Sequence, residues 1–343
     1  MNSTGEFIKI LREVFALDSK WVDWFMRDVF IEDELRFVEA DNHTASVMVV
    51  TPYSMDFHGQ MVRCDYISCV ATLPSQRGKG LMRTLMHETL TRAYTEGVPF
   101  ACLIPASRPL YFIYNRLGFA SVFYINEERY TSLHAFHEGK HQTAEPTYEI
   151  FRRLEDRRAG TIRHNERQFR QAVADMELSN GFTVAVTDGE KSEAMAFAQI
   201  THEIKVVDIL STDSDATEAV LAEVRKRGGE KPVIIMAQPT EESTILSARG
   251  MLRIINVQAA LNAYAKGLPD LKFNLRVRDK FIPENNGYYS IKDGICTKAS
   301  EKTKKVDLDV SVNVLAEILF SAPKIGNLFD LPTRRPFLSL MLD

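Results

Sequence analysis

Residues suited to binding an anion are concentrated in the turn Arg77-Gly78-Lys79-Gly80-Leu81-Met82, which joins two apolar segments. Residues 66–73 before the turn are rich in branched and aromatic side chains, and they predict a strand that ends at Pro74. After the turn, apolar residues at three- and four-residue spacing predict a helix with one buried face: Leu81, Met82, Leu85, Met86, Leu90 and Ala93. Free N–H groups at a helix N-terminus beside positive charge favour a phosphate or pyrophosphate. The simpler alternative is a surface turn that carries two basic residues by chance.

A second strand and a second helix are predicted further along the chain. Residues 99–104 predict another strand, and a short helical run then leads to Tyr114, Gly118 and Phe119, with Gly118 suited to a left-handed helix stop. Together the segments resemble the GCN5-related N-acetyltransferase (GNAT) family. In that family the pattern Gln/Arg-x-x-Gly-x-Gly/Ala holds the coenzyme A pyrophosphate, and Tyr-x-x-x-Gly-Phe supplies an acid near the thiol. Arg77 and Gly80 match the first pattern, Tyr114 begins a match to the second, and Met82 departs from the first.

The variant with Met82 is similar to the enhanced-intracellular-survival subfamily of these acetyltransferases. The resemblance implies an α+β chain with two tandem GNAT folds, each a mixed central sheet flanked by helices, and a C-terminal α+β domain similar to sterol carrier proteins. On this chain the catalytic GNAT domain would be residues 1–150, the degenerate GNAT-like domain residues 151–266, and the sterol-carrier-like domain residues 267–343.

The elements expected after residue 150 repeat the first order without its chemistry. The sequence predicts strands at 182–187, 194–201 and 206–210, a helix at 216–227, a strand at 233–237 and a helix at 242–249. The turn into the repeat's helix, residues 211–215, is acidic where the first turn is basic, so it should not bind coenzyme A. From about Pro269, alternating strands, two glycine-containing turns and a final helix suit the third domain.

Bulk properties restrict the function classes. A chain of 343 residues suits two or three domains, and a net charge of −4 argues against non-specific nucleic-acid binding. No apolar run is long enough to cross a membrane, and the N-terminus has no signal-sequence pattern. The four cysteines, Cys64, Cys69, Cys102 and Cys296, lack metal-ligand spacing. We therefore expect reduced thiols, no bound metal and a cytoplasmic protein.

The resemblance implies roles for the residues around the turn. Backbone groups of Val70, Ala71 and Thr72 would follow the pantetheine arm, and one of their N–H groups would be the oxyanion donor. The pyrophosphate would be held by the backbone N–H groups of six consecutive residues: Gly78, Lys79, Gly80, Leu81, Met82 and Arg83. The side chains of Arg77, Lys79 and Arg83 would add positive charge. By residue type alone, Val70–Thr72 would be an ordinary central strand, and only its position favours the functional interpretation.

Two residues are candidates for proton transfer. The phenol of Tyr114 can protonate a thiolate leaving group, with Tyr111, one turn earlier, as its main competitor. Tyr114 could instead be a core tyrosine. In the subfamily the chain's own C-terminal carboxylate reaches into the first domain's pocket as the base, which implies Asp343 here. Residues 336–342 are mostly apolar and suit burial, although such a tail could also be packed for stability or frayed in solvent.

We therefore expect an acetyl-coenzyme-A-dependent N-acetyltransferase that moves the acetyl group directly to a primary amine. An aminoglycoside-like compound, a polyamine or a lysine side chain is the expected acceptor, with acetyl-coenzyme A as cosubstrate. The resemblance also implies self-association, with a hexamer as one form. The alternative is a non-catalytic lipid- or coenzyme-A-binding protein that uses the sterol-carrier-like domain.

Overall fold

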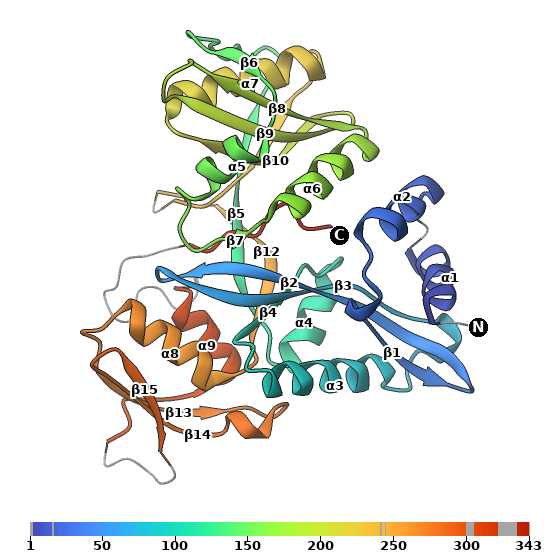
Figure 1. Cartoon of the computed structure of the whole chain (residues 1–343), viewed down its shortest axis with the longest axis vertical. Helices are drawn as coiled ribbons and strands as arrows, with labels where there is room; N and C mark the ends of the chain where they lie inside the picture. The colour runs from blue at the N-terminus through green and yellow to red at the C-terminus, as the bar shows by residue number, and fades with distance from the viewer. Residues whose placement is uncertain are drawn as a thin grey trace. The chain divides into compact units, whose positions relative to one another are not determined.

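The computed structural model describes residues 3–15, 17–240, 242–243, 245–299, 305–321 and 335–342 (Figure 1). Contacts divide the chain into two units. The first unit combines the described residues of Met1–Phe123 and Arg249–Arg334, and the second combines Tyr124–Ala248 with Arg335–Leu342. The division into three consecutive domains at 150 and 266 stays a prediction.

The first unit begins with helices α1 (Ser3–Phe15) and α2 (Ser19–Trp24). Apolar and aromatic residues between Asp18 and Phe30 predict a single helix. In the structure, α2 gives way to a wider π-type turn, Phe25–Val29, followed by a 3-10 turn, Glu32–Glu34. The wider turn brings Phe30 against Phe7, with ring centroids 5.2 Å apart. Aromatic packing therefore overrides the helical repeat at this point.

An antiparallel meander follows, made of β1 (Leu35–Ala40), β2 (His43–Phe57) and β3 (Gln60–Thr72). The sequence predicts a strand at 45–51 that ends at Pro52. In the structure the strand continues, and Pro52 lies opposite Asp65 in a hairpin that extends to Phe57 and Gln60. A proline removes only one ladder donor, which so long a hairpin tolerates. Helix α3 (Leu81–Thr95) then leads to β4 (Phe100–Leu103), parallel to β3, and to α4 (Arg108–Arg116).

The second unit repeats this order. Strands β8 (Gly181–Thr187), β9 (Glu193–Ile200) and β10 (Ile204–Ser211) form an antiparallel meander, and α7 (Ser214–Gly228) leads to β11 (Val233–Ala237), which is parallel to β10. Before the repeat come four further elements: β6 (Gln142–Ala144), α5 (Tyr148–Glu155), β7 (Ile162–Arg163) and α6 (Glu166–Leu178). The predicted repeat of elements is thus present as far as β11.

In each unit, one strand comes from a segment that follows the last helix or strand of the other unit in the sequence. Strand β5 (Ala120–Tyr130) follows α4 of the first unit, yet its residues Asn126–Tyr130 pair with β11 of the second. Conversely, β12 (Leu246–Ile254) follows β11, and its residues Met251–Ile254 pair with β4 of the first unit. The helix predicted at 242–249 is wrong, because residues 246–249 are the beginning of β12. The later residues of this strand find their partner in β4, about 150 residues earlier in the chain, and such distant pairing can override local preference.

The C-terminal part of the first unit matches the predicted strands and turns. It contains α8 (Val257–Gly267), β13 (Phe273–Arg278), a 3-10 turn (Pro283–Asn285), β14 (Gly287–Lys292), β15 (Ile295–Ala299), β16 (Leu308–Ser311) and α9 (Val312–Leu319). The strands form a separate sheet in the order β15-β14-β13-β16. Along β13, Phe273, Leu275 and Val277 are buried and the residues between them are more exposed.

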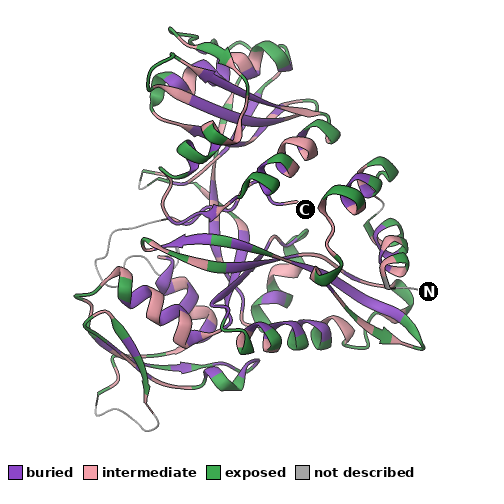
Figure 2. Ribbon diagram, viewed as in Figure 1, coloured by how far each residue is buried: buried purple, intermediate pink, exposed green. Residues whose placement is uncertain are grey.

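Buried residues concentrate in the strands and exposed residues on the outward faces of the helices (Figure 2). The predicted apolar face of α3 is confirmed, since Leu85, Met86, Leu90 and Ala93 are buried and Met82 is half-buried. The mixed α/β class with helices flanking a mixed sheet is likewise confirmed. None of the helices in the described part of the chain combines the length and hydropathy that a bilayer crossing requires.

Candidate acetyl-coenzyme A site

The turn before α3 has an open backbone. Gly78 and Gly80 have φ angles of +79° and +80°, and Gly80 is the N-cap residue of the helix. A Cβ atom built on either glycine would have no heavy atom within 4 Å. Both positions therefore favour glycine for their left-handed conformation, and the space beside the helix N-terminus is free for a ligand.

Three cationic side chains, those of Arg77, Lys79 and Arg83, belong to the turn and to the beginning of α3. The Arg77 Nε donates to the Thr72 carbonyl at 3.2 Å, and the Lys79 ammonium donates to Gln76 Oε1 at 2.7 Å, with Asp41 3.8 Å away. The guanidinium of Arg83 lies over the ring of Phe281, 5.6 Å from its centroid. Because these are exposed contacts, a phosphate group could replace them at little cost.

The carboxyl end of β3 carries a bulge. Val47 pairs with Ala71 and Val49 with Ser68, so β3 holds one residue more than β2 over this stretch, and Cys69 takes a positive φ of 52°. The parallel register of β3 with β4 joins Cys64–Tyr66 to Phe100–Cys102, and Val70–Thr72 lie beyond it. A bulge bends its strand, so this is where a ligand could run along the backbone between β3 and β4.

Tyr114 lies near these elements in a shared core. Its side chain is buried in a cluster against which Val70 and Met82 also pack, and its ring lies edge-to-face with that of Phe119 at 5.7 Å. Burial raises the pKa of Tyr114 to about 12. Within the described ranges, no group hydrogen-bonds to its hydroxyl.

Tyr111, the competing candidate, is placed differently. Its hydroxyl donates to the Arg249 carbonyl at 3.1 Å, and partial burial raises its pKa. The Tyr111 phenol is therefore already committed to a structural contact, whereas the Tyr114 phenol is not.

Asp343 lies outside the described residues. The tail before it is described as far as Leu342, and it packs on the second unit. Phe337, Leu338, Leu340 and Met341 are buried, and Phe337 forms a parallel bridge with Thr161.

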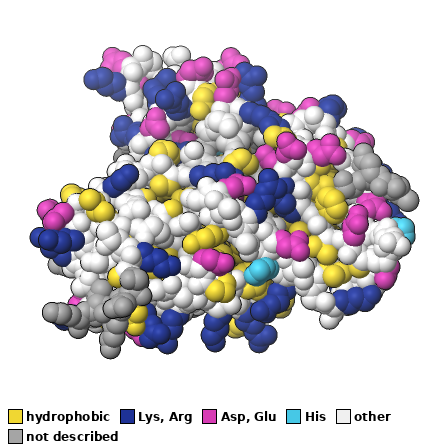
Figure 3. Space-filling model, turned by 60° about the horizontal axis from the view of Figure 1, so that its bottom comes forward, with side chains coloured by type: hydrophobic (Ala, Val, Ile, Leu, Met, Phe, Trp, Pro, Cys, Tyr) yellow, Lys and Arg dark blue, Asp and Glu magenta, His cyan; other side chains and the backbone are white. Residues whose placement is uncertain are grey.

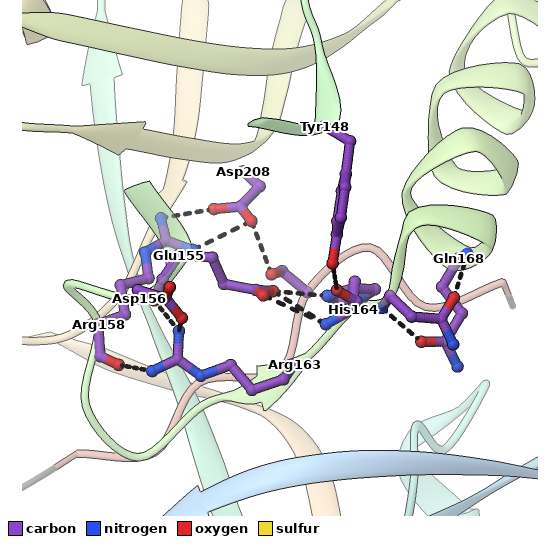
Figure 4. Close-up of polar contacts among 10 residues, drawn as sticks. Tyr148, Glu155, Asp156, Arg158, Arg163, His164, Gln168 and Asp208 are labelled. Atoms are coloured by element: carbon purple, nitrogen blue, oxygen red, sulfur yellow. Dashed lines mark hydrogen bonds and ion pairs between the residues drawn. The ribbon is translucent and has the colours of Figure 1, made fainter. Parts of the chain in front are cut away.

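A polar network holds this tail (Figure 4). Ser339 Oγ donates to Asp208 at 2.7 Å, and Asp208 also pairs with the guanidinium of Arg158 at 2.7 Å. Arg158 in turn lies over the Phe337 ring, 5.1 Å from its centroid. Next to this, the buried Glu155 carboxylate contacts His164 Nδ1 at 2.8 Å. Sequence reasoning missed this network, since its members are dispersed along the chain with no local spacing that joins them.

No metal centre was expected, and within the described ranges no group of three or more potential ligand side chains comes together. All four cysteines are unbonded thiols. Burial is the main cause that raises the pKa of the Cys64 thiol, and contact with Cys102 adds to it.

Comparisons with known proteins identify two parts of the chain. Residues 2–122 match the family described as the acetyltransferase (GNAT) domain, and residues 257–331 match the sterol carrier protein domain. The chain thus carries a GNAT acetyltransferase domain and a sterol carrier protein domain, as the motifs predicted, and the expected enzyme class is confirmed at the level of the domain family.

Several solved structures share the fold over almost the whole chain. A GCN5-related N-acetyltransferase from Anabaena variabilis is 16% identical with a TM-score of 0.74, covering 93% of this chain and 87% of its own. One from Kribbella flavida is 18% identical with a TM-score of 0.72, covering 92% and 86%. Eis1 from Mycobacterium abscessus is 15% identical with a TM-score of 0.70, covering 92% and 86%. At such low sequence identities, the similarity shows that the fold is shared. A search of curated protein sequences gave no significant match.

Proposed function

We propose that the chain transfers an acetyl group from acetyl-coenzyme A directly to a primary amine. One observation carries the proposal: the open glycine turn leads into the helix whose Met82 packs in the same core cluster as Val70 and Tyr114. The glycine turn, the end of β3 and a phenol of suitable chemistry thus border one core of the first unit, which supports the proposal.

Acetyl-coenzyme A supplies an activated thioester, and the residues present fit its charged end. Backbone N–H groups of Gly78–Arg83 hold the pyrophosphate, with charge from Arg77, Lys79 and Arg83. Val70, Ala71 and Thr72 follow the pantetheine arm. A backbone N–H in this strand end donates to the thioester oxygen, where negative charge develops.

Tyr114 acts on the sulfur of the leaving group. With a pKa of about 12, its phenol keeps its proton throughout the neutral range. Complete transfer to a free thiolate of pKa about 8.5 would be unfavourable, so donation of a hydrogen bond while the carbon–sulfur bond breaks is the more effective contribution. Solvent then supplies the proton that the departing thiol keeps.

The main-chain carboxylate of Asp343 serves as the base. An amine with a pKa of roughly 10.4 is mostly protonated at neutral pH and must lose a proton before attack. Support comes from the tail, because Phe337, Ser339 and Met341 fix the chain close to its last residue. An anchored backbone loses less entropy when its end group is held in place for reaction.

The acceptor that we propose is a small polyamine, an aminoglycoside-like compound or a lysine side chain. We propose a cytoplasmic location because the thiols are unbonded, and we retain self-association, with a hexamer as one form. Neither nucleic acid nor a membrane is needed for this reaction.

Thiol release from acetyl-coenzyme A tests the proposal, measured against a panel of polyamines, aminoglycosides and lysine peptides. Tyr114→Phe should lower kcat about a hundredfold or more while coenzyme A affinity, measured by calorimetry, stays unchanged. Tyr111→Phe is the matched control and should retain activity. Two glycines added after Asp343 displace the terminal carboxylate and should also lower kcat.

Normal turnover in the extended chain would remove Asp343 from the mechanism. Coenzyme A binding without turnover on any amine would instead favour the non-catalytic binding protein.

A further inference from the structure

The sheet of the sterol carrier protein domain carries a cavity of about 630 Å³ that has no part in acetyl transfer as proposed above. It lies where the end of β13 meets the loop to β14 and the end of β15. Its volume falls within the range typical of small-molecule sites, roughly 300–1,000 Å³. The lining residues are Arg276, Val277, Arg278, Asp279, Lys280, Asn286, Gly287, Tyr288, Lys298 and Ala299.

Positive charge dominates this cavity. Four of the lining side chains are cationic: Arg276, Arg278, Lys280 and Lys298. Arg276 and Arg278 share the single carboxylate of Asp309, at 3.7 and 3.0 Å, and Lys280 makes no ion pair within the described ranges. Figure 3 brings the underside of the fold forward and shows Lys and Arg side chains gathered along its lower edge.

The one acidic lining residue does not offset this charge. The Asp279 carboxylate is buried and pairs with the buried Arg253 guanidinium at 2.6 Å. It also accepts hydrogen bonds from the backbone N–H groups of Phe281 and Ile282 and from the Asn285 amide. Its charge is therefore compensated inside the protein. Among the residues that the structure describes, Asp309 is the carboxylate that pairs with the cations at the cavity.

The cavity wall is built by specific packing. The Arg276 guanidinium lies over the Tyr288 ring, 5.7 Å from its centroid, and the Lys298 ammonium lies 5.5 Å from the centroid of Tyr289. Lys298 also donates to the Glu284 carbonyl at 2.5 Å. A Cβ on Gly287 would come within 2.7 Å of the Lys298 side chain, so this lysine passes directly over the glycine. The aromatic rings hold cations in place while leaving them able to donate hydrogen bonds.

We propose that this cavity binds a phosphate-bearing ligand, separate from the coenzyme A turn. Two guanidinium groups from alternate positions on one strand can each make paired hydrogen bonds to a phosphate, which lysine alone does not provide. The apolar residues of β13, Phe273, Leu275 and Val277, are buried, so the side chains that this strand exposes at the cavity are the two arginines. A phosphate group can come from a soluble nucleotide or from a lipid headgroup.

Calorimetry on the full chain, with coenzyme A at saturation to block the first site, tests this inference. The probes are pyrophosphate, ATP, and phosphatidylcholine vesicles with and without phosphatidic acid. The double variant Arg276→Gln with Arg278→Gln should lower the affinity for the bound probe about a hundredfold, a tenfold loss for each charge-assisted contact. A matched control, Lys272→Gln with Lys292→Gln, removes the same charge from exposed residues of the same domain that pair with Asp293. The control should bind as the parent does.

The outcomes separate clearly. Binding of pyrophosphate or ATP that the double variant loses supports a soluble ligand, and binding only of vesicles with phosphatidic acid that it loses supports a lipid headgroup. Equal affinity in the double variant and the control overturns the inference, as does the absence of binding to every probe. A double variant that loses coenzyme A affinity would also overturn it, because the cavity would then belong to the first site. Thermal unfolding of both variants checks that they fold.

Discussion

At the scale of single residues, Gly118 illustrates how local and distant demands meet. Its φ of +89° places it just after α4, where a left-handed residue ends the helix, and the Phe119 N–H returns to the Tyr114 carbonyl at 3.1 Å. A Cβ at this position would lie 2.8 Å from the guanidinium of Arg253. The same glycine therefore stops the helix that bears Tyr114 and leaves room for a buried ion pair.

Replacing Gly118 with alanine should cost far more stability than the backbone angle alone explains. The left-handed conformation costs about 1–2 kcal/mol for a residue with a Cβ. The collision also displaces Arg253 from Asp279, and breaking a buried pair costs about 3–5 kcal/mol. Gly97→Ala is the matched control, because Gly97 has a φ of +74° but open space around it. Urea unfolding of both variants measures the difference, and equal losses would mean that Arg253 moves aside at no cost.

Residue-level prediction from the sequence succeeded where the signal was local. The helix stop at Gly118 and the glycine turn before α3 follow from neighbouring residues, and both are confirmed by positive φ angles. The contact of Gly118 with Arg253 could not be predicted, since the two residues lie on elements far apart in the chain. The roles of Tyr114 and Asp343 stay predictions.

At the scale of elements, the two meanders show how one order of strands and helices can carry different turns. The turn before α3 has glycines and cations, whereas α7 is capped by Asp213, whose carboxylate accepts from the Ala216 N–H at 2.8 Å. Asp213 also accepts from Ser192 Oγ at 2.7 Å. These hydrogen bonds, led by that of Ala216, lower the pKa of Asp213 to about 2. An internal carboxylate therefore occupies the helix N-terminus that in the first unit is open.

Removing this cap should destabilise the second unit in a pH-dependent way. Asp213→Ala should cost about 1 kcal/mol, the usual value for a lost N-cap. Because the pKa of Asp213 is lower when folded than its ordinary 3.8, its charge stabilises the fold above pH 3.8, and this stabilisation is lost as the pH falls towards 2. Asp213→Asn keeps a capping oxygen without the charge. Its deficit in unfolding free energy should shrink between those two pH values, and a deficit independent of pH would contradict the argument.

The type of an element was predictable where its apolar residues recur with the period of a helix or of a strand. Strand β12 shows where this kind of prediction fails. Residues 242–249 were predicted to form a helix, yet residues 246–249 begin β12, whose later residues Met251–Ile254 pair with β4. Strand β5 in turn pairs with β11. Exchange of strands between two similar folds leaves no trace in the period of either segment. The pattern predicted which elements exist but could not predict which unit each one completes.

At the scale of the whole molecule, the tail links the last residues of the chain to the second unit. Phe337 packs with Ile125 and Met236, and its backbone N–H donates to the Gly160 carbonyl at 3.3 Å. Leu340 joins a separate core with Phe151 and Phe197. A segment of eight described residues thus takes part in two clusters of the second unit. The tail is therefore part of the hydrophobic packing of the second unit and does more than cover its surface.

Truncating Phe337 should reveal whether this anchoring serves stability alone or also catalysis. Phe337→Ala removes a ring that is 2% exposed, and such a change costs about 3–5 kcal/mol. Leu133→Ala is the matched control, since Leu133 belongs to the same unit and is 92% exposed. If the terminal carboxylate is the base, Phe337→Ala should also lower kcat at temperatures where the protein remains folded, with coenzyme A affinity unchanged, because the freed tail no longer holds Asp343 in place. Loss of stability with full kcat would leave the tail a structural role only, and the base would have to be sought in the first unit.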